Sequence, residues 1–176
     1  INGSKTYFIH YIVMHKLIDE DIYKKYLDLG GEINLIDDTW STPISCCIDN
    51  NLIDIAKIMI NNGAITKKQD VHTITPLVQY LRLYGGKDLD FIDFLISKSD
   101  VNDIQTSYRF DETNDSLSAI LRSKENDENK LIVVKKLFDN GYNFDNKPHI
   151  TEFYFDILSD DLSDDLRNYL DEKFNE

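Results

Sequence analysis

Residues 42–64 read Thr-Pro-Ile-Ser-Cys-Cys-Ile-Asp-Asn-Asn-Leu-Ile-Asp-Ile-Ala-Lys-Ile-Met-Ile-Asn-Asn-Gly-Ala, and this stretch decides the fold. The hydroxyl of Thr42 can cap a helix, and Pro43 suits the first helical position, where no backbone donor is needed. A short apolar helix should follow, and then a polar turn at Asp49–Asn51. A second helix should end at Gly63, because glycine readily adopts the left-handed backbone that closes a helix. The stretch therefore predicts a helical hairpin.

The same pattern returns 33 residues later, where Thr75-Pro76-Leu77 repeats Thr42-Pro43-Ile44. Gly30 and Gly63 are also 33 residues apart. A fixed period of this size indicates a stack of similar units, because one amphipathic helix pair cannot bury its apolar side alone. An unrelated small helical bundle is the alternative. Asp37 and Asp70 share the same spacing, each five residues before a Thr-Pro pair, and this agreement of Thr-Pro, glycine and aspartate makes the bundle the weaker interpretation.

We therefore predict an all-α fold, a solenoid of about five irregular helix-turn-helix repeats with short hairpin loops. Residues 1–176 should form a single domain, with repeats at approximately 1–36, 37–69, 70–104, 110–147 and 148–176. The later repeats depart from the regular spacing. A polar segment at 104–114 is longer than its earlier counterparts, and a charged turn at 123–129 should delay the following helix until Leu131.

The overall charge limits the partners that this chain could bind. Its formal net charge is −13, which disfavours nucleic acid and anionic membranes because both reward cations. A basic protein surface is the better complement. The two cysteines, Cys46 and Cys47, are adjacent and form neither a disulfide framework nor a metal-binding pattern, which fits a reducing compartment. The longest apolar run, Tyr7–Met14, is too short to span a bilayer.

The repeated residues resemble the ankyrin repeat, whose pattern is Asp-x-x-Gly-x-Thr-Pro-Leu-His-x-Ala followed by a second helix and Gly-Ala. The second unit matches at the five positions Asp37, Thr42, Pro43, Gly63 and Ala64. The third unit matches at Asp70, Thr75, Pro76 and Leu77, and the first keeps the histidine as His10. The departures are that three units lack the proline, and that Trp40 and Thr73 occupy the position of the glycine.

Irregular ankyrin repeats rich in Ile, Asn and Asp are similar to those of the poxvirus host-range proteins. That resemblance implies a domain that captures a host protein, an interferon-response or other antiviral factor, in the host cytoplasm. It also implies recruitment of the host Skp1–cullin ubiquitin ligase through a separate carboxyl-terminal F-box-like segment. Residues 150–176 read as another repeat, so the chain would be the substrate-capturing part of a longer protein. A purely structural spacer remains the alternative function.

No pattern of catalysis, metal binding or cofactor binding is found in the sequence, so we predict no enzyme activity. Gly85-Gly86-Lys87 superficially suggests a phosphate-binding loop, but it lacks the leading glycine, the Ser or Thr after lysine and a preceding strand. We interpret it as a helix–helix turn. His10 and His15 are five residues apart, so they do not share one helix face as a metal-binding pair would. Cys46 and Cys47 are expected to be packed core residues.

The candidate partner-binding residues lie at the predicted loop tips. Trp40 is the only tryptophan, and an exposed aromatic side chain is typical of binding hot spots. It could equally fold back onto a neighbouring tip. The long segment after the third unit combines aromatic side chains with an arginine, which suits either an interface or a cover over the core. The predicted binding residues are Asp38, Trp40, His72, Thr73, Ile74, Tyr108, Arg109 and Phe110.

Overall fold

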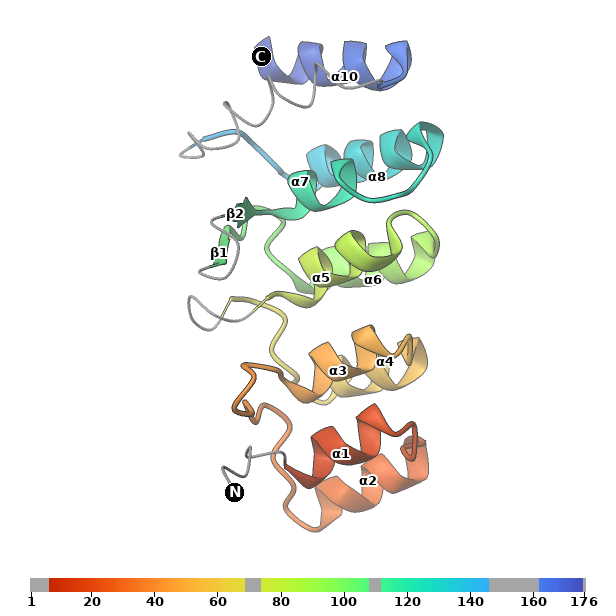
Figure 1. The fold of residues 1–176 in the computed structure, drawn as a ribbon, viewed down its shortest axis with the longest axis vertical. Coiled ribbons are helices and arrows are strands. Elements are labelled where there is room, and N and C mark those ends of the chain that lie inside the picture. Colours follow the sequence, from red (N-terminus) through yellow and green to blue (C-terminus); the bar gives the residue numbers. More distant parts are fainter. Residues whose placement is uncertain (1–6, 69–73, 108–111, 146–161, 176) are drawn as a thin grey trace.

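A stack of helix pairs makes up the described part of the computed structural model, which comprises residues 7–68, 74–107, 112–145 and 162–175. The first helices of the described pairs lie side by side along the stack, and in the three middle pairs the second helix packs against the first (Figure 1). The all-α prediction is confirmed. The helices are α1 (Phe8–Met14), α2 (Glu20–Asp28), α3 (Pro43–Asp49), α4 (Ile53–Asn61), α5 (Pro76–Tyr84), α6 (Leu89–Lys98), α7 (Ser116–Leu121), α8 (Asp127–Asp139) and α10 (Asp164–Asn175).

Side-chain caps determine where several helices begin. Thr42 and Ser45 form a reciprocal capping box, in which Ser45 N donates to Thr42 Oγ1 over 3.2 Å and Thr42 N donates to Ser45 Oγ over 2.8 Å. Asp115 and Ser118 form the same arrangement at the start of α7. Thr75 precedes Pro76 in the same way as Thr42 precedes Pro43, but its side chain makes no capping hydrogen bond. The repeated Thr-Pro pair therefore marks two helix starts that are capped differently.

The core runs continuously through the stack, because consecutive first helices bury apolar side chains against one another. Ile48, Leu81 and Ile120 are fully buried in α3, α5 and α7, respectively. Behind them, the second helices contribute a parallel row of buried side chains: Tyr23, Met59, Leu95, Leu137 and Leu170. No helix pair in the described ranges has a core of its own, as expected for a repeat architecture.

Asparagine side chains connect consecutive repeats at the loops that follow the second helices. Asn34 Nδ2 donates to the Gly63 carbonyl over 3.1 Å, and Ile65 N donates to Asn34 Oδ1 over 2.9 Å. Asn102 makes the equivalent pair of hydrogen bonds to Gly141 and Asn143. These paired bonds fix the spacing of one repeat against the next.

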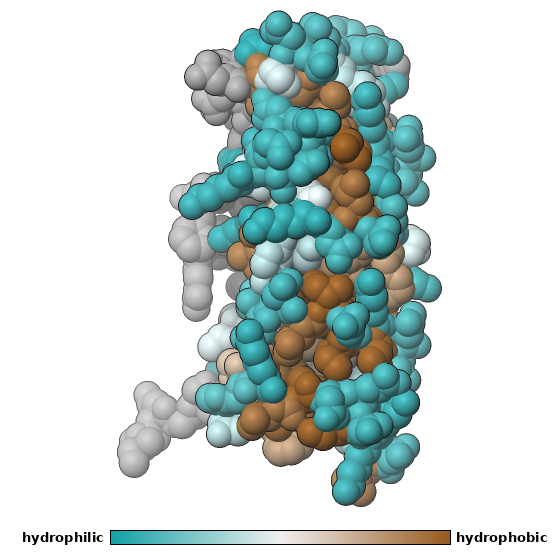
Figure 2. Space-filling model, turned by 90° about the vertical axis from the view of Figure 1, so that its right-hand side faces the viewer, coloured by the Kyte–Doolittle hydropathy of each residue, from teal (hydrophilic) through white to brown (hydrophobic). Residues whose placement is uncertain are grey.

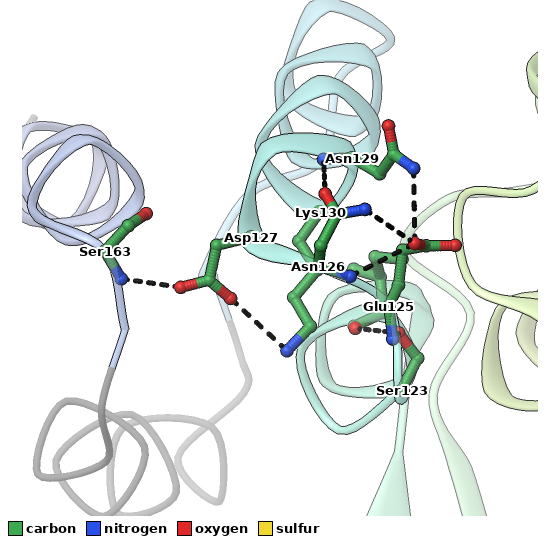
Figure 3. Close-up of polar contacts among 8 residues, drawn as sticks. Ser123, Glu125, Asn126, Asp127, Asn129, Lys130 and Ser163 are labelled. Carbon is green, nitrogen blue, oxygen red and sulfur yellow. Dashed lines mark hydrogen bonds and ion pairs between the residues drawn. The ribbon is translucent and has the colours of Figure 1, made fainter.

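Helix α8 begins four residues earlier than predicted, at Asp127 instead of Leu131. Figure 3 shows the cause, since the Asn126 side chain caps the helix by accepting a hydrogen bond from Asn129 N over 2.9 Å. Glu125 Oε1 accepts further bonds from Asn126 and Asn129. The charged segment therefore forms a capped turn and the first turn of a helix. Asp127 also accepts a hydrogen bond from Ser163 N over 2.6 Å and so connects α8 to the start of α10.

A short β-hairpin lies between α6 and α7, where the sequence predicted only a long polar segment. Strand β1 (Gln105–Ser107) pairs antiparallel with β2 (Glu112–Asn114), and Thr106 is opposite Thr113. The hairpin projects from the same side of the stack as the loop between α2 and α3 (Figure 1). The turns that join the two helices of each pair lie on the opposite side.

Candidate functional site

The loop between α2 and α3 is held in one conformation by the carboxylate of Asp37, which is buried at its base. Asp37 Oδ1 accepts hydrogen bonds from Thr39 N over 2.8 Å, Thr39 Oγ1 over 2.7 Å and Ser41 N over 3.0 Å. Burial opposes ionisation of this carboxyl, but the hydrogen bonds from Thr39 and Ser41 outweigh it and hold the pKa of Asp37 below its ordinary value. The loop is therefore ordered around a charged, hydrogen-bonded centre.

His10 connects this loop to the first repeat. Its side chain is fully buried, and Nε2 lies 2.9 Å from the carbonyl oxygen of Ser41. A carbonyl oxygen can only accept a hydrogen bond, so Nε2 carries the proton. This hydrogen bond joins residues 31 positions apart in the sequence and connects α1 to the next loop. Asp37 and His10 together determine where the tip of the loop stands.

Trp40 occupies that tip in a backbone conformation that is unusual for a large residue. Its φ angle is 64°, in the left-handed region, and its side chain is 48% exposed. Trp40 N donates to the Asp37 carbonyl over 3.0 Å, which closes the turn. Residues with a side chain are disfavoured in this region, whereas glycine is not. The ankyrin pattern places glycine at this position, so the tryptophan replaces the residue that the backbone prefers.

The structure places some of the predicted binding residues and leaves the others outside the described ranges. Asp38 and Trp40 are both exposed on one loop. Ile74 is exposed directly before Thr75, at the approach to α5. The remaining five lie outside the described residues: His72, Thr73, Tyr108, Arg109 and Phe110. We call the full predicted set of eight residues the hairpin-tip surface.

A second exposed apolar surface was missed by the sequence interpretation. Figure 2 views the molecule from the side of the helix–helix turns and shows apolar residues in a band along the stack between polar margins. Leu17, in the turn between α1 and α2, and Leu83, near the end of α5, are exposed apolar residues in this part of the fold. The available signal was Leu17, an apolar residue in the turn between the first two helices, where polar residues are usual.

Metal-ligating side chains are not clustered in the described part of the chain. Within those ranges, no three His, Cys, Asp or Glu side chains are grouped so that they could hold a metal ion. None of the helices in the described part of the chain is long and apolar enough to cross a membrane. Cys46 and Cys47 are both buried, and burial raises the pKa of the Cys46 thiol to about 12. Gly85 and Gly86 form the turn after α5, as predicted.

Comparison with known proteins gives one relative of the type that the repeats suggest. The chain is 24% identical over 101 residues to a protein of fowlpox virus (strain NVSL) that is named as an ankyrin repeat protein, FPV219. The match covers 56% of this chain and 23% of the fowlpox protein, so it spans less than a quarter of that protein's length. No protein-family model matches the chain.

Proposed function

We propose that this chain is a non-enzymatic protein-binding domain of the ankyrin-repeat type and that it contacts its partner through the hairpin-tip surface. The stack of helix pairs and the similarity to a fowlpox protein named for ankyrin repeats support a role in protein–protein interaction. The described loop between α2 and α3, which carries Asp38 and Trp40, projects from one side of the stack (Figure 1), and binding residues are commonly found on such loops. The partner would be a protein, because the charge of −13 disfavours nucleic acid.

The observation that carries the proposal is the strained conformation of Trp40. A left-handed backbone costs a residue with a side chain roughly 1–2 kcal/mol, and Trp40 adopts this conformation while 48% of its surface stays exposed. Strain of this kind concentrates at functional sites. A large, half-exposed aromatic side chain on a hydrogen-bonded loop is suited to fill a pocket on another protein.

The finer part of the proposal concerns the identity of the partner. The similarity to a poxvirus protein suggests a host protein, and we propose an interferon-response or other antiviral factor in the host cytoplasm. The domain would act as the substrate-recognition part of a ubiquitin-ligase adaptor. Recruitment of Skp1–cullin would fall to an F-box-like segment outside residues 1–176, because residues 150–176 read as a repeat.

The experiment that tests the binding role uses Trp40→Gly, which removes the ring and relieves the backbone strain together. We expect this variant to be at least as stable as the wild type, while partner affinity falls more than tenfold, as for a hot-spot loss of about 2 kcal/mol. Leu17→Ala is the matched control, because it removes an exposed apolar side chain from the opposite side of the stack. Quantitative mass spectrometry of proteins retained from interferon-treated cells, with and without each substitution, gives the readout.

The outcomes separate binding at the tips from the alternatives. A host protein that is retained by the wild type and by Leu17→Ala, but lost with Trp40→Gly, supports the proposal. Loss with Leu17→Ala alone would assign binding to the side of the helix–helix turns. If all three forms retain the same proteins, the domain is a structural spacer and the proposal is wrong. Denaturant unfolding of each variant shows that a lost interaction is not a lost fold.

A further inference from the structure

The first repeat exposes three large apolar side chains at positions that the later described helices bury. Phe8 and Tyr11 in α1 are 65% and 51% exposed, and Ile22 in α2 is 39% exposed. We call these three residues the N-terminal face. Isolated apolar residues on a surface are ordinary, so the question is whether these positions are usually exposed in this fold.

The equivalent positions in the later first helices are buried. Phe8 is the first residue of α1 and Tyr11 is the fourth. In α3, α5 and α7 the first and fourth residues are all buried, as Pro43 and Cys46, Pro76 and Gln79, and Ser116 and Ala119. Among the first helices that the structure describes, the exposure of these two positions is therefore specific to α1.

The second helices show the same contrast. Ile22 stands eight residues before Gly30, which follows the end of α2. Eight residues before Gly63, Ser99 and Gly141 stand Ile55, Phe91 and Val133, and all three of these are buried. By contrast, the residue directly before each closing position is exposed in every case, as Leu29, Asn62, Lys98 and Asn140. Leu29, which is 81% exposed, thus occupies a position that is exposed in all four of these helix ends. Ile22 occupies a position that is buried in the other three.

In the later repeats, the preceding repeat covers these positions. Gln79, the fourth residue of α5, donates to the Ser45 carbonyl over 3.1 Å and to Asp49 Oδ1 over 2.7 Å, and both acceptors belong to α3. The ammonium of Lys57 in α4 lies 5.6 Å from the centre of the Phe91 ring in α6. The N-terminal face therefore consists of the positions through which each later helix pair contacts the pair before it.

The opposite end of the stack is different in character. Helix α10 buries Leu166 and Leu170 and packs against α8. Its remaining exposed residues are polar: Asp164, Asp165, Asn168, Glu172 and Asn175. A polar outer helix is typical of a terminal repeat that caps an array. In a head-to-tail contact between two copies, the apolar N-terminal face of one copy would meet this polar helix of the other, and the two surfaces do not match.

We propose that the N-terminal face stacks against a further helix-turn-helix repeat, which precedes α1 in the full-length polypeptide. The occupant is of the same kind as the repeats described, because the face presents the positions that each later repeat offers to its predecessor. Phe8, Tyr11 and Ile22 would then be core residues of a longer array.

Cysteine accessibility in the full-length polypeptide tests this proposal. Tyr11→Cys and Ile22→Cys report on the face, and Leu29→Cys is the matched control at a position that is exposed in every repeat described. The native thiols give a low background because Cys46 and Cys47 are buried. We expect a maleimide to label the first two variants at least tenfold more slowly than the control. Removal of all residues before Ile1 should abolish this difference.

Three results would overturn the proposal. The first is equal labelling of all three variants in the full-length polypeptide, because the face would then be open. The second is slow labelling in a protein that light scattering shows to be a dimer, which would assign the face to a second copy. The third is slow labelling that persists after the residues before Ile1 are removed. Slow labelling in a monomer, relieved by that truncation, supports it.

Discussion

Asp37 shows how one side chain can fix the shape of a loop that carries no regular secondary structure. Its carboxylate accepts three hydrogen bonds from Thr39 and Ser41 and lies below the exposed Trp40. Charge-assisted bonds of this type are roughly twice as strong as neutral ones. The conformation of the tip therefore depends on the ionised form of a single group.

Asp37→Asn should lower the free energy of unfolding at pH 7 by about 1–3 kcal/mol, because a buried, charged acceptor is replaced by a neutral amide. The pKa of Asp37 is lowered on folding from an ordinary value near 3.8, so its stabilising contribution is present above that value. It is lost as the pH falls through the folded pKa. Urea unfolding at pH 7 and in progressively stronger acid should show the wild type and variant converge. A constant difference would contradict this, and Asp38→Asn is the exposed control.

Tyr142 and Asp115 form a buried, hydrogen-bonded pair. The Tyr142 hydroxyl donates to Asp115 Oδ2 over 2.6 Å. The pKa of Tyr142 is raised mainly by burial and, to a smaller extent, by the charge of Asp115. Tyr142→Phe should cost about 1–3 kcal/mol, because the carboxylate loses a donor that water cannot replace. Denaturant midpoints measure the loss, with the half-exposed Tyr11→Phe as control. Equal midpoints for the two variants would show that the bond contributes nothing net.

Among the elements, some asparagine side chains form hydrogen bonds to the next repeat, whereas others bond only within their own repeat. Asn34→Ala removes two hydrogen bonds to the backbone of the next repeat, at Gly63 and Ile65. We expect a loss of about 1–2 kcal/mol in the free energy of unfolding. Asn62→Ala is the control, because that side chain bonds only locally, to the Ile58 carbonyl within its own helix. A larger effect of the control would mean that the connection between repeats is incidental.

The turn after α5 is where two repeats approach most closely through a glycine. Gly85 has a φ of 58°, and a Cβ placed there would lie 2.7 Å from Cβ of Glu125. Gly85→Ala should cost about 2–4 kcal/mol, from backbone strain and a contact that no side-chain rotation relieves. Gly63 also has a positive φ, of 97°, but open space around it, so Gly63→Ala should cost only about 1–2 kcal/mol. Thermal unfolding of both variants tests which substitution lowers the stability more. A larger loss for Gly63→Ala would show that the close approach at Gly85 is not what makes a substitution costly.

The elements also show which parts of the fold the sequence predicts and which it does not. Pro43 and Pro76 begin helices as predicted, because proline at the first helical position is a local signal. Leu131 was the wrong start for α8, because Asn126 can cap a helix only when Glu125 and the turn hold it in place. Strands β1 and β2 were missed because three-residue strands carry no periodicity and are stabilised only by each other. The tip residue Trp40 was predicted, but its strained backbone depends on the hydrogen bonds of Asp37.

At the scale of the whole molecule, a stack without separate cores has a characteristic response to damage. Each repeat contacts only its neighbours, so stability is approximately the sum of repeat and interface contributions. A change in the middle of the stack weakens two interfaces, and a change at one end weakens one. The position of a substitution along the stack should therefore determine which helices it destabilises, more than the type of side chain that is removed.

Leu81→Ala and Leu170→Ala remove equally buried leucine side chains, one from the central helix α5 and one from the terminal helix α10. Each should cost about 2–5 kcal/mol locally, as a cavity in a packed core does. Because α5 packs against both α3 and α7, Leu81→Ala should accelerate amide exchange on both sides of the substitution. Leu170→Ala should accelerate exchange in α10 and in adjoining α8, while α3 and α5 keep their protection. Hydrogen exchange with mass spectrometry distinguishes the two patterns, and uniform acceleration by both variants would mean that the stack unfolds as one cooperative unit.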